Sequence, residues 1–154
     1  MAERSMPTGL KFVMKSNLVK LMQESNVWLY RKSGGKLGGR MKGAPILLLT
    51  TRGRKTGKQR VTPLIYLRRD SGELVVVASK GGWSAHPLWY GNLQADAAVQ
   101  VQIGRDVRPM QARTAGPDER AQVWPELVRM FPDYAEYQSW SDREIPVVLL
   151  RAAA

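Results

Sequence analysis

The sequence contains no cysteine and only one histidine, His86. Disulfide bonds, thiolate catalysis and cysteine-ligated zinc are therefore excluded, and a single imidazole excludes a multi-histidine metal centre. No apolar run approaches the roughly 20 residues of a membrane-spanning helix. The N-terminus also lacks the continuous apolar region of a signal peptide. The sequence predicts a cytoplasmic protein without a metal site.

Acidic residues are scarce. The 154 residues include 13 Asp and Glu against 24 Lys and Arg, which gives a net charge of +11. Such an excess favours a nucleic acid, an anionic membrane surface or an acidic ligand as partner. The positive charge is the only feature that suggests a nucleic acid. The sequence contains no recognition helix and no RNA-binding motif. We therefore expect no nucleic-acid partner, and the length fits one compact domain.

Residues 1–44 differ from the rest of the chain by their basic, amphipathic pattern. They hold nine Lys and Arg against two Glu, and apolar residues recur at roughly helical spacing between Leu10 and Met22. An aromatic cluster at residues 27–30 follows. Such a helix can lie on the anionic inner face of the cell membrane, or it can pack on the protein body or on another subunit.

Four glycines follow this segment, and they predict a flexible link into the body of the protein. They stand at positions 34, 35, 38 and 39. The sequence thus divides into a basic N-terminal segment, residues 1–44, and a domain formed by residues 45–154.

Beyond residue 45 the pattern becomes that of short strands rich in Val, Ile, Leu and Thr. Tight-turn signals at residues 69–72 and 104–106 join two strand pairs. Six such strands favour an antiparallel barrel, because closure removes exposed edges. Two helical pieces lie between them, Pro87 to Ala95 and Pro117 to Phe131. The predicted strands are 46–51, 61–68, 73–79, 98–104, 107–114 and 146–151.

A dense cluster of positive charge lies between the first two predicted strands, in the segment 52–60, which we call the basic loop. It contains five cations, two glycines and no acid. Like charges this close repel one another, so the pattern predicts an anionic ligand rich in phosphate or carboxylate. The alternative is a solvated hairpin turn. A nucleotide-hydrolysing P-loop is excluded, because Gln59 replaces the magnesium-binding Ser or Thr and the loop leads into a strand.

Three further segments could line a ligand site. Residues 78–83 offer backbone amides and the Ser79 hydroxyl. Residues 87–93 open a helix with aromatic side chains that suit a flat ring or the protein core. Tyr134 and Tyr137 share a face of a helical turn and could line a pocket or cap the barrel. No segment supplies a nucleophile or a proton-transfer pair, and His86 has no evident acidic partner. The chemistry of an enzyme built this way belongs to an organic cofactor.

In this order the motifs resemble the deazaflavin-dependent nitroreductases. The resemblance implies an α+β fold, a split β-barrel of the flavin-reductase type that binds coenzyme F420. About six antiparallel strands would be joined by an N-terminal helix and two short helical segments. The similar stretches span nearly the whole chain: Leu48 to Thr51, Gly53 to Lys58, Arg60 to Leu64, Ala78 to Gly82, His86 to Tyr90, Asn92-Leu93, Tyr134 with Tyr137-Gln138, and Asp142-Arg143 with Ile145-Pro146.

The resemblance also implies roles for particular residues. Those expected to hold the phosphate and tail of F420 are Arg54, Lys55, Thr56, Arg60, Val61, Thr62, Pro63, Leu64 and Ile65. Those expected to meet the deazaflavin ring are Val77, Ala78, Ser79, Lys80, Leu88, Trp89, Tyr90, Gly91 and Asn92. Tyr134 would close over cofactor and substrate, with Tyr137 and Ser79 beside the substrate, so these three are the expected catalytic residues.

The implied function is an F420H2-dependent oxidoreductase that transfers a hydride to quinones, and in some members of the family to nitroimidazoles. An F420- or flavin-binding storage module without turnover is the alternative. Two residues depart from the family pattern. Gly91 replaces the usual Leu, which predicts looser packing, and Phe131 stands where some nitro-reducing members have Tyr. The missing hydroxyl favours quinones over nitroimidazoles as acceptors.

Overall fold

The computed structural model of the chain describes residues 17–80 and 85–153, with side chains from residue 24 onward. In this part, the helices are α2 (Asn17–Ser33), α3 (Leu88–Ala95), α4 (Pro117–Met130) and α5 (Asp133–Trp140). The strands are β1 (Arg40–Met41), β2 (Ala44–Arg52), β3 (Gln59–Arg68), β4 (Leu74–Val77), β5 (Ala98–Ile103), β6 (Asp106–Thr114) and β7 (Val147–Ala152).

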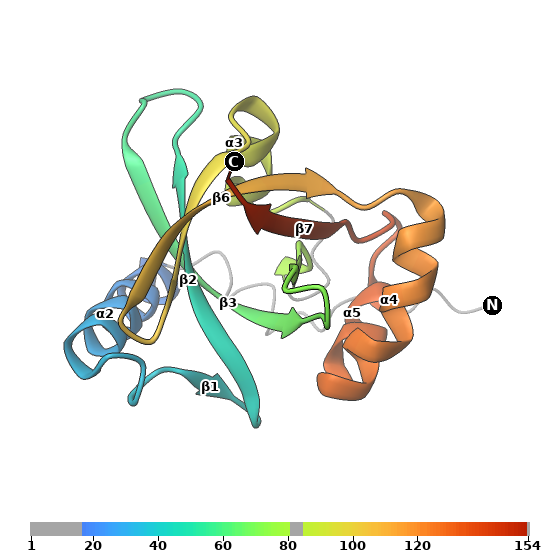
Figure 1. The fold of residues 1–154 in the computed structure, drawn as a ribbon, viewed down its shortest axis with the longest axis horizontal. Helices are drawn as coiled ribbons and strands as arrows, with labels where there is room; N and C mark the ends of the chain where they lie inside the picture. Colours follow the sequence, from blue (N-terminus) through green and yellow to red (C-terminus); the bar gives the residue numbers. More distant parts are fainter. Residues whose placement is uncertain (1–16, 81–84, 154) are drawn as a thin grey trace.

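Six of the strands form a closed antiparallel barrel in the order β2-β3-β4-β7-β6-β5, and β5 pairs back with β2 (Figure 1). The two-residue strand β1 pairs only with the start of β2. The predicted split barrel and its six strands are confirmed. The structure adds β1, and it makes the tyrosine segment a separate helix, α5, where the sequence predicts a single helical turn.

Alternation along the strands explains why they close around a core. In β5, Val99 and Val101 are buried, while Gln100 between them is exposed. Strand β4 is instead buried on both faces. Its Leu74 and Val76 belong to the core inside the barrel, whereas Val75 and Val77 belong to a second core outside it.

Helices α4 and α5 cover that outer face of β4 and lie together at one side of the barrel (Figure 1). Their buried side chains pack with Val75 and Val77 in the second core. At about 25 cal/mol per Å² of buried apolar surface, such a core contributes several kcal/mol. The side chains that the two helices and their connection bury there are Val123, Leu127, Phe131 and Tyr134.

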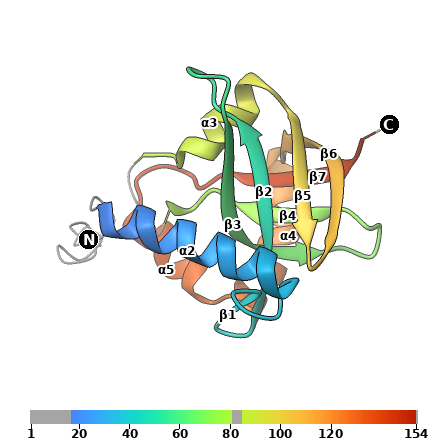
Figure 2. The ribbon, with the colours of Figure 1, turned by 90° about the vertical axis from the view of Figure 1, so that its left-hand side faces the viewer.

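Helix α2 packs against β3 and crosses the barrel wall (Figure 2). It is held by Tyr30, whose hydroxyl lies 3.1 Å from the Ile46 carbonyl oxygen and 3.3 Å from that of Gln102. The same hydroxyl accepts a 2.8 Å hydrogen bond from the Gly104 amide. The ring itself is buried. The part of the predicted helix before residue 17 lies outside the described residues.

The glycines after α2 form a compact turn, where the sequence predicts a flexible link. The Gly35 amide donates to the Tyr30 carbonyl at 2.8 Å, and Gly35 has a φ of +84°, which favours glycine. A β-carbon on Gly35 would lie 3.1 Å from Gly104 Cα. The turn needs small residues because it packs directly on the β5–β6 turn. The division of the chain at residue 44 stays a prediction.

Among the described helices, none is both long and apolar enough to cross a bilayer.

The Tyr30 hydroxyl offers a direct test of how α2 is attached. We expect Tyr30→Phe to lower the free energy of unfolding by about 1–2 kcal/mol, because buried backbone groups lose their partner. Urea unfolding of the two proteins measures the difference. Tyr66→Phe is the matched control, since Tyr66 is also buried and its hydroxyl makes no hydrogen bond with the described residues. Equal effects of the two substitutions would contradict the assignment.

Candidate functional site

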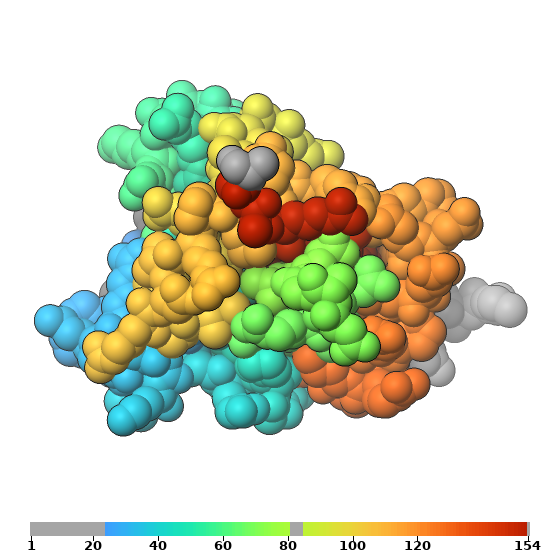
Figure 3. Space-filling view, in the orientation of Figure 1, coloured from blue at the N-terminus to red at the C-terminus, as the bar shows by residue number. Residues whose placement is uncertain are grey.

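The basic loop connects the ends of β2 and β3, which remain paired as far as Arg52 and Gln59. The Gly53 amide donates to the Lys58 carbonyl at 2.8 Å, and the Gly57 amide donates to the Gly53 carbonyl at 2.8 Å. Gly57 has a φ of +70°, a conformation that glycine adopts without strain. These bonds give the loop a defined turn. It projects with α3 at one end of the molecule (Figure 3).

All five cations of the basic loop are exposed to solvent. None of them lies within ion-pair distance of a carboxylate in the described part of the chain. Their mutual repulsion is therefore relieved only by solvent ions or by an anionic ligand. The loop fits a polyanion, as the sequence predicts. The cations are Arg52, Arg54, Lys55, Lys58 and Arg60.

The backbone of the loop is tied to α3 through Asn92. The Asn92 Oδ1 atom accepts a 3.2 Å hydrogen bond from the Arg54 amide, and Nδ2 donates to Thr51 Oγ1 at 3.2 Å. The side chain of Asn92 is buried, with 7% of the residue exposed. Asn92 thus links the loop to the helix. The resemblance leads us to expect that Asn92 also meets the deazaflavin ring. The expectation itself stays a prediction.

The other predicted residues of α3 divide between core and surface. Trp89 and Tyr90 are buried in the barrel core, and the Tyr90 hydroxyl lies 2.9 Å from Thr114 Oγ1. Leu88, by contrast, is 75% exposed, more than any other large apolar side chain in the described part. Leu88 is therefore the predicted ring contact on α3 that is freely available to a ligand.

The predicted tail contacts on β3 are half-buried and directly adjoin the basic loop. Val61 pairs with Thr50 and Ile65 pairs with Ile46, so these residues follow β2 back toward the barrel. Thr56, in the loop itself, accepts a 3.2 Å hydrogen bond from the Lys58 amide through its hydroxyl. The half-buried residues are Val61, Thr62, Pro63, Leu64 and Ile65.

The segment 77–80 begins where β4 ends. The Ala78 amide donates to the Pro146 carbonyl at 2.9 Å, and Ser79 is largely buried. Lys80 has a φ of +46°, which is uncommon for a residue with a side chain and marks local backbone strain. Residues 81–83 of the predicted loop lie outside the described residues.

Arg143 joins this segment to the lead-in of α3. Its Nη2 atom donates to the carbonyls of Ala78 and Ser79 at 3.1 and 2.9 Å. Its Nη1 atom lies 3.0 Å from His86 Nδ1. Arginine has no acceptor, so His86 must accept with a neutral ring nitrogen. Partial burial, and then the Arg143 cation, lower the pKa of His86, which keeps the imidazole neutral.

Sequence reasoning missed the role of Arg143, which it noticed only as part of a similar motif. His86 does have a partner, but this partner is an arginine and not the acid that would orient a catalytic histidine. The two residues are 57 positions apart, so no local spacing pattern signals their contact.

The two predicted tyrosines lie on α5 in different surroundings. Tyr134 is 4% exposed and packs against Phe131 with 5.0 Å between ring centroids. Burial raises its pKa, so the hydroxyl stays protonated. Tyr137 is half-buried, and burial raises its pKa as well. Of the two, Tyr137 has the more accessible side chain.

Helix α5 reaches the segment 77–80 through a chain of hydrogen bonds. Gln138 Nε2 donates to the Arg143 carbonyl at 2.9 Å, and its Oε1 accepts from the Ile145 amide at 2.9 Å. Arg143 in turn donates to the Ser79 carbonyl. These hydrogen bonds link Ser79 to α5, the helix that carries Tyr134 and Tyr137, and the catalytic roles of the three residues stay predictions.

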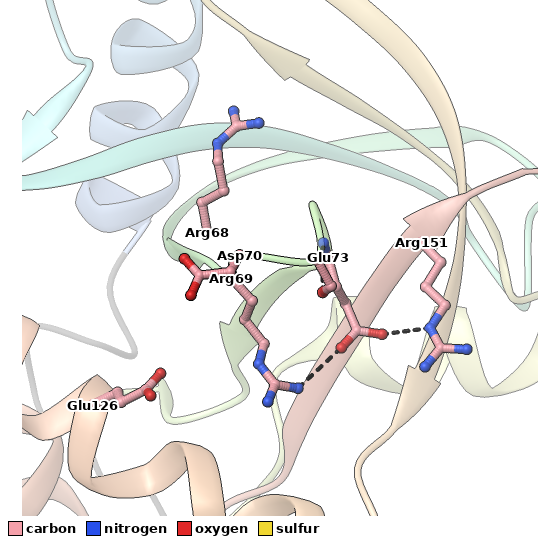
Figure 4. A pocket seen from close by; sticks show the side chains of 7 residues that line it. Arg68, Arg69, Asp70, Glu73, Glu126 and Arg151 are labelled. Atoms are coloured by element: carbon pink, nitrogen blue, oxygen red, sulfur yellow. Dashed lines mark hydrogen bonds and ion pairs between the residues drawn. The ribbon is translucent and has the colours of Figure 1, made fainter.

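A separate polar pocket of about 410 Å³ lies at the β3–β4 turn and contains none of the predicted residues (Figure 4). The buried Glu73 pairs there with Arg69 at 3.3 Å and with Arg151. Three arginines and three acids line the pocket, so their charges balance. We assign it a structural role, joining the turn to β7. The lining residues are Arg68, Arg69, Asp70, Ser71, Glu73, Glu126 and Arg151.

Comparison with known proteins finds one family over most of the chain. Residues 22–152 match the model of the F420H(2)-dependent quinone reductases. A Mycobacterium tuberculosis protein assigned by name to these reductases is 45% identical over 113 residues, 73% of this chain and 94% of its own length. A second M. tuberculosis protein, named F420H(2)-dependent quinone reductase, is 39% identical over 126 residues, 79% of this chain and 84% of its own length. A solved F420-H2 dependent reductase superposes with a TM-score of 0.63 at 44% identity, covering 70% of this chain and 94% of its own.

The contact between Arg143 and His86 can be tested by NMR, because the sequence has a single histidine. We expect Arg143→Ala to raise the pKa of His86, since a neighbouring cation that disfavours the protonated ring is removed. Titration of the imidazole proton resonances measures this pKa directly. Arg113→Ala is the control, because Arg113 pairs with Glu119 at 2.6 Å on another part of the barrel. A His86 pKa that is the same in the wild type and in Arg143→Ala would contradict the contact.

Proposed function

Because this chain belongs to the F420H(2)-dependent quinone reductase family, whose cofactor is reduced coenzyme F420, we propose how its residues share the work of an F420H2-dependent oxidoreductase. The basic loop binds the anionic part of the cofactor, the segment 77–80 and α3 orient its ring, and α5 lies beside a quinone acceptor. The hydride that the reduced deazaflavin supplies is the reducing equivalent of this reaction.

The observation that carries the proposal is the set of five exposed loop cations without carboxylate partners among the described residues. F420 carries a phosphodiester and an oligoglutamate tail, so its charge complements the loop. Asn92 ties this loop to α3. A ligand held by the loop would therefore extend along α3, where Leu88 is exposed. The residues present fit the cofactor.

The protein contributes binding, orientation and electrostatics. Arg143 donates hydrogen bonds to the Ala78 and Ser79 carbonyls, and these bonds fix the backbone of the segment 77–80. Tyr137, protonated and half-buried, would donate a hydrogen bond to the oxygen on which charge develops in the acceptor. Tyr134 supports α5 from the core, and we propose that its ring closes this side of the site.

We propose quinones as the main acceptors, with nitroaromatic compounds as poorer ones. Phe131 packs against Tyr134 in the second core and brings no hydroxyl to this region. A tyrosine at this position would offer the nitro oxygens one further hydroxyl donor, which Phe131 cannot supply.

Charge removal in the basic loop tests the cofactor assignment. We expect Arg54→Ala and Lys55→Ala each to weaken F420 binding by a few-fold or more, with a larger difference at low salt because salt screens exposed charges. Fluorescence titration with F420, set beside FMN, measures both effects. Arg129→Ala on α4 is the control, since it also removes one exposed cation but lies on the other side of the barrel. Unaltered affinity in both loop variants would refute the assignment.

Stopped-flow mixing then separates an enzyme from a storage module. The wild type, loaded with F420H2, is mixed with a menaquinone analogue and, in parallel, with a nitroimidazole. We expect oxidation of F420H2 by the quinone to be the faster reaction. A protein that binds F420H2 but reduces none of several quinones would be a storage module.

We further propose that α2 contacts an anionic membrane, where hydrophobic quinones dissolve. Trp28 on α2 is 60% exposed, and Leu29 beside it is partly exposed. Lys32 Nζ lies 6.0 Å from the centre of the Trp28 ring, and the last turn of the helix also carries Arg31. Exposed aromatic and basic residues on one helix are typical of interfacial binding.

Cosedimentation with vesicles tests this contact. We expect Trp28→Ser to reduce binding to vesicles that contain anionic phosphatidylglycerol several-fold, because the apolar anchor is lost. The control is Val107→Ser, which removes an apolar side chain from β6 that is 53% exposed, close to the 60% of Trp28. If Trp28→Ser and the wild type sediment alike, or if neither protein sediments with anionic vesicles, the membrane contact is wrong.

A further inference from the structure

Gly91 lies in the middle of α3, in contact with the side chain of Arg54. A β-carbon placed on Gly91 would be 1.8 Å from Arg54 Nη1 and 2.9 Å from Cζ. These distances are shorter than any real contact of a β-carbon. The Arg54 guanidinium therefore occupies the space that a side chain at position 91 would need. The sequence predicts looser packing at Gly91, whereas in the structure a cation fills the gap.

No backbone requirement explains a glycine at this position. Gly91 is not among the glycines with positive φ, and its place in α3 is one that any helix-forming residue can adopt. Glycine inside a helix lowers stability relative to alanine, because its backbone loses more conformational freedom on folding. Among the described residues, the contact with Arg54 is the feature that accounts for a glycine at this position.

The backbone of Arg54 is held at the helix independently of its side chain. Its amide donates to Asn92 Oδ1, and Asn92 is buried and bonded to Thr51. The backbone of Arg54 is thus held at Asn92, the residue that follows Gly91 on α3. With its origin fixed, the direction of the guanidinium depends on whether position 91 is empty.

From this geometry we infer that Gly91 is a positioning residue, which lets the Arg54 guanidinium rest on α3 instead of extending from the loop into solvent. The inference rests on the proposed function in one respect, the identity of the ligand. Arg54 remains solvent-exposed in this position, so the cation is available to an anion. It lies at the junction of the basic loop and the helix, whereas Lys55 and Lys58 belong to the exposed turn.

This position assigns Arg54 a different part of the ligand from the lysines. A cation on α3 would meet the phosphodiester, which lies between the ring portion of F420 and its tail. The exposed lysines of the turn would meet the carboxylates of the distal tail. Gly91 thereby contributes to cofactor affinity without itself contacting the anionic groups of the cofactor.

The test is Gly91→Ala, measured in the wild-type and Arg54→Ala backgrounds. In the wild-type background we expect F420 affinity to fall about 5-fold or more, because a charge-assisted contact is displaced. The dependence of affinity on salt should become shallower. Binding of the deazaflavin chromophore without phosphodiester and tail should not change. In the Arg54→Ala background, Gly91→Ala should cause no further loss.

Thermal unfolding without ligand gives a second readout, which does not depend on F420. Gly91→Ala should raise Tm more in the Arg54→Ala background than in the wild type, because displacing the guanidinium offsets part of the gain in helix propensity. Gln94→Ala is the matched control on the exposed side of α3. It should raise Tm equally in both backgrounds and leave F420 affinity unchanged.

The outcomes separate this inference from the proposed function. If the wild type binds F420 and Gly91→Ala binds it equally well, or if the loss persists in the Arg54→Ala background, the positioning role is overturned and the cofactor assignment stands. If the wild type does not bind F420, the cofactor assignment falls. The two Tm differences then decide the contact alone, and equal differences would overturn it.

Discussion

The closure of the barrel between β2 and β5 is the constraint on which the rest of the structure depends. Only three residue pairs form this seam, Leu48 with Gln102, Leu49 with Val101 and Thr50 with Gln100. The Tyr30 hydroxyl lies across its end, near carbonyl oxygens of both strands. An open sheet would leave two edges with unpaired backbone groups. The short seam thus removes both edges and is supported from outside by α2.

Closure also determines where the segments of the candidate site meet. Because β2 belongs to the seam, its end and the basic loop are held beside α3, and Asn92 bonds to both the end of the strand and the loop. At the end of β4, Arg143 bonds to the segment 77–80 and to His86 just before α3. Helix α3 therefore lies between the basic loop, which can anchor negative charge, and the segment 77–80, whose backbone Arg143 fixes. A cofactor with a flat ring and an anionic tail needs both regions at a set separation.

The residues of the proposed site reduce the stability of the fold. The loop concentrates positive charge without carboxylate partners among the described residues, Lys80 has strained backbone, and Gly91 forgoes helix propensity. Each feature lowers the free energy of unfolding, and the apolar burial in the two cores offsets this loss. This distribution is the usual one, because residues chosen for binding a ligand are seldom those that maximise stability.

The sequence by itself determined the elements and the chemical character of the site. The alternation in β5 and the tight turns predict strands, and these signals are local, because side-chain direction follows from spacing along one strand. The basic loop is visible for the same reason, since its glycines and cations are neighbours in the chain. Only the tertiary structure decided which side chains meet. The pairing of Arg143 with His86, the seating of Arg54 on Gly91 and the compact turn at Gly35 all join residues that no periodic pattern relates. Their contacts follow from strand register and barrel closure, which the whole chain fixes together.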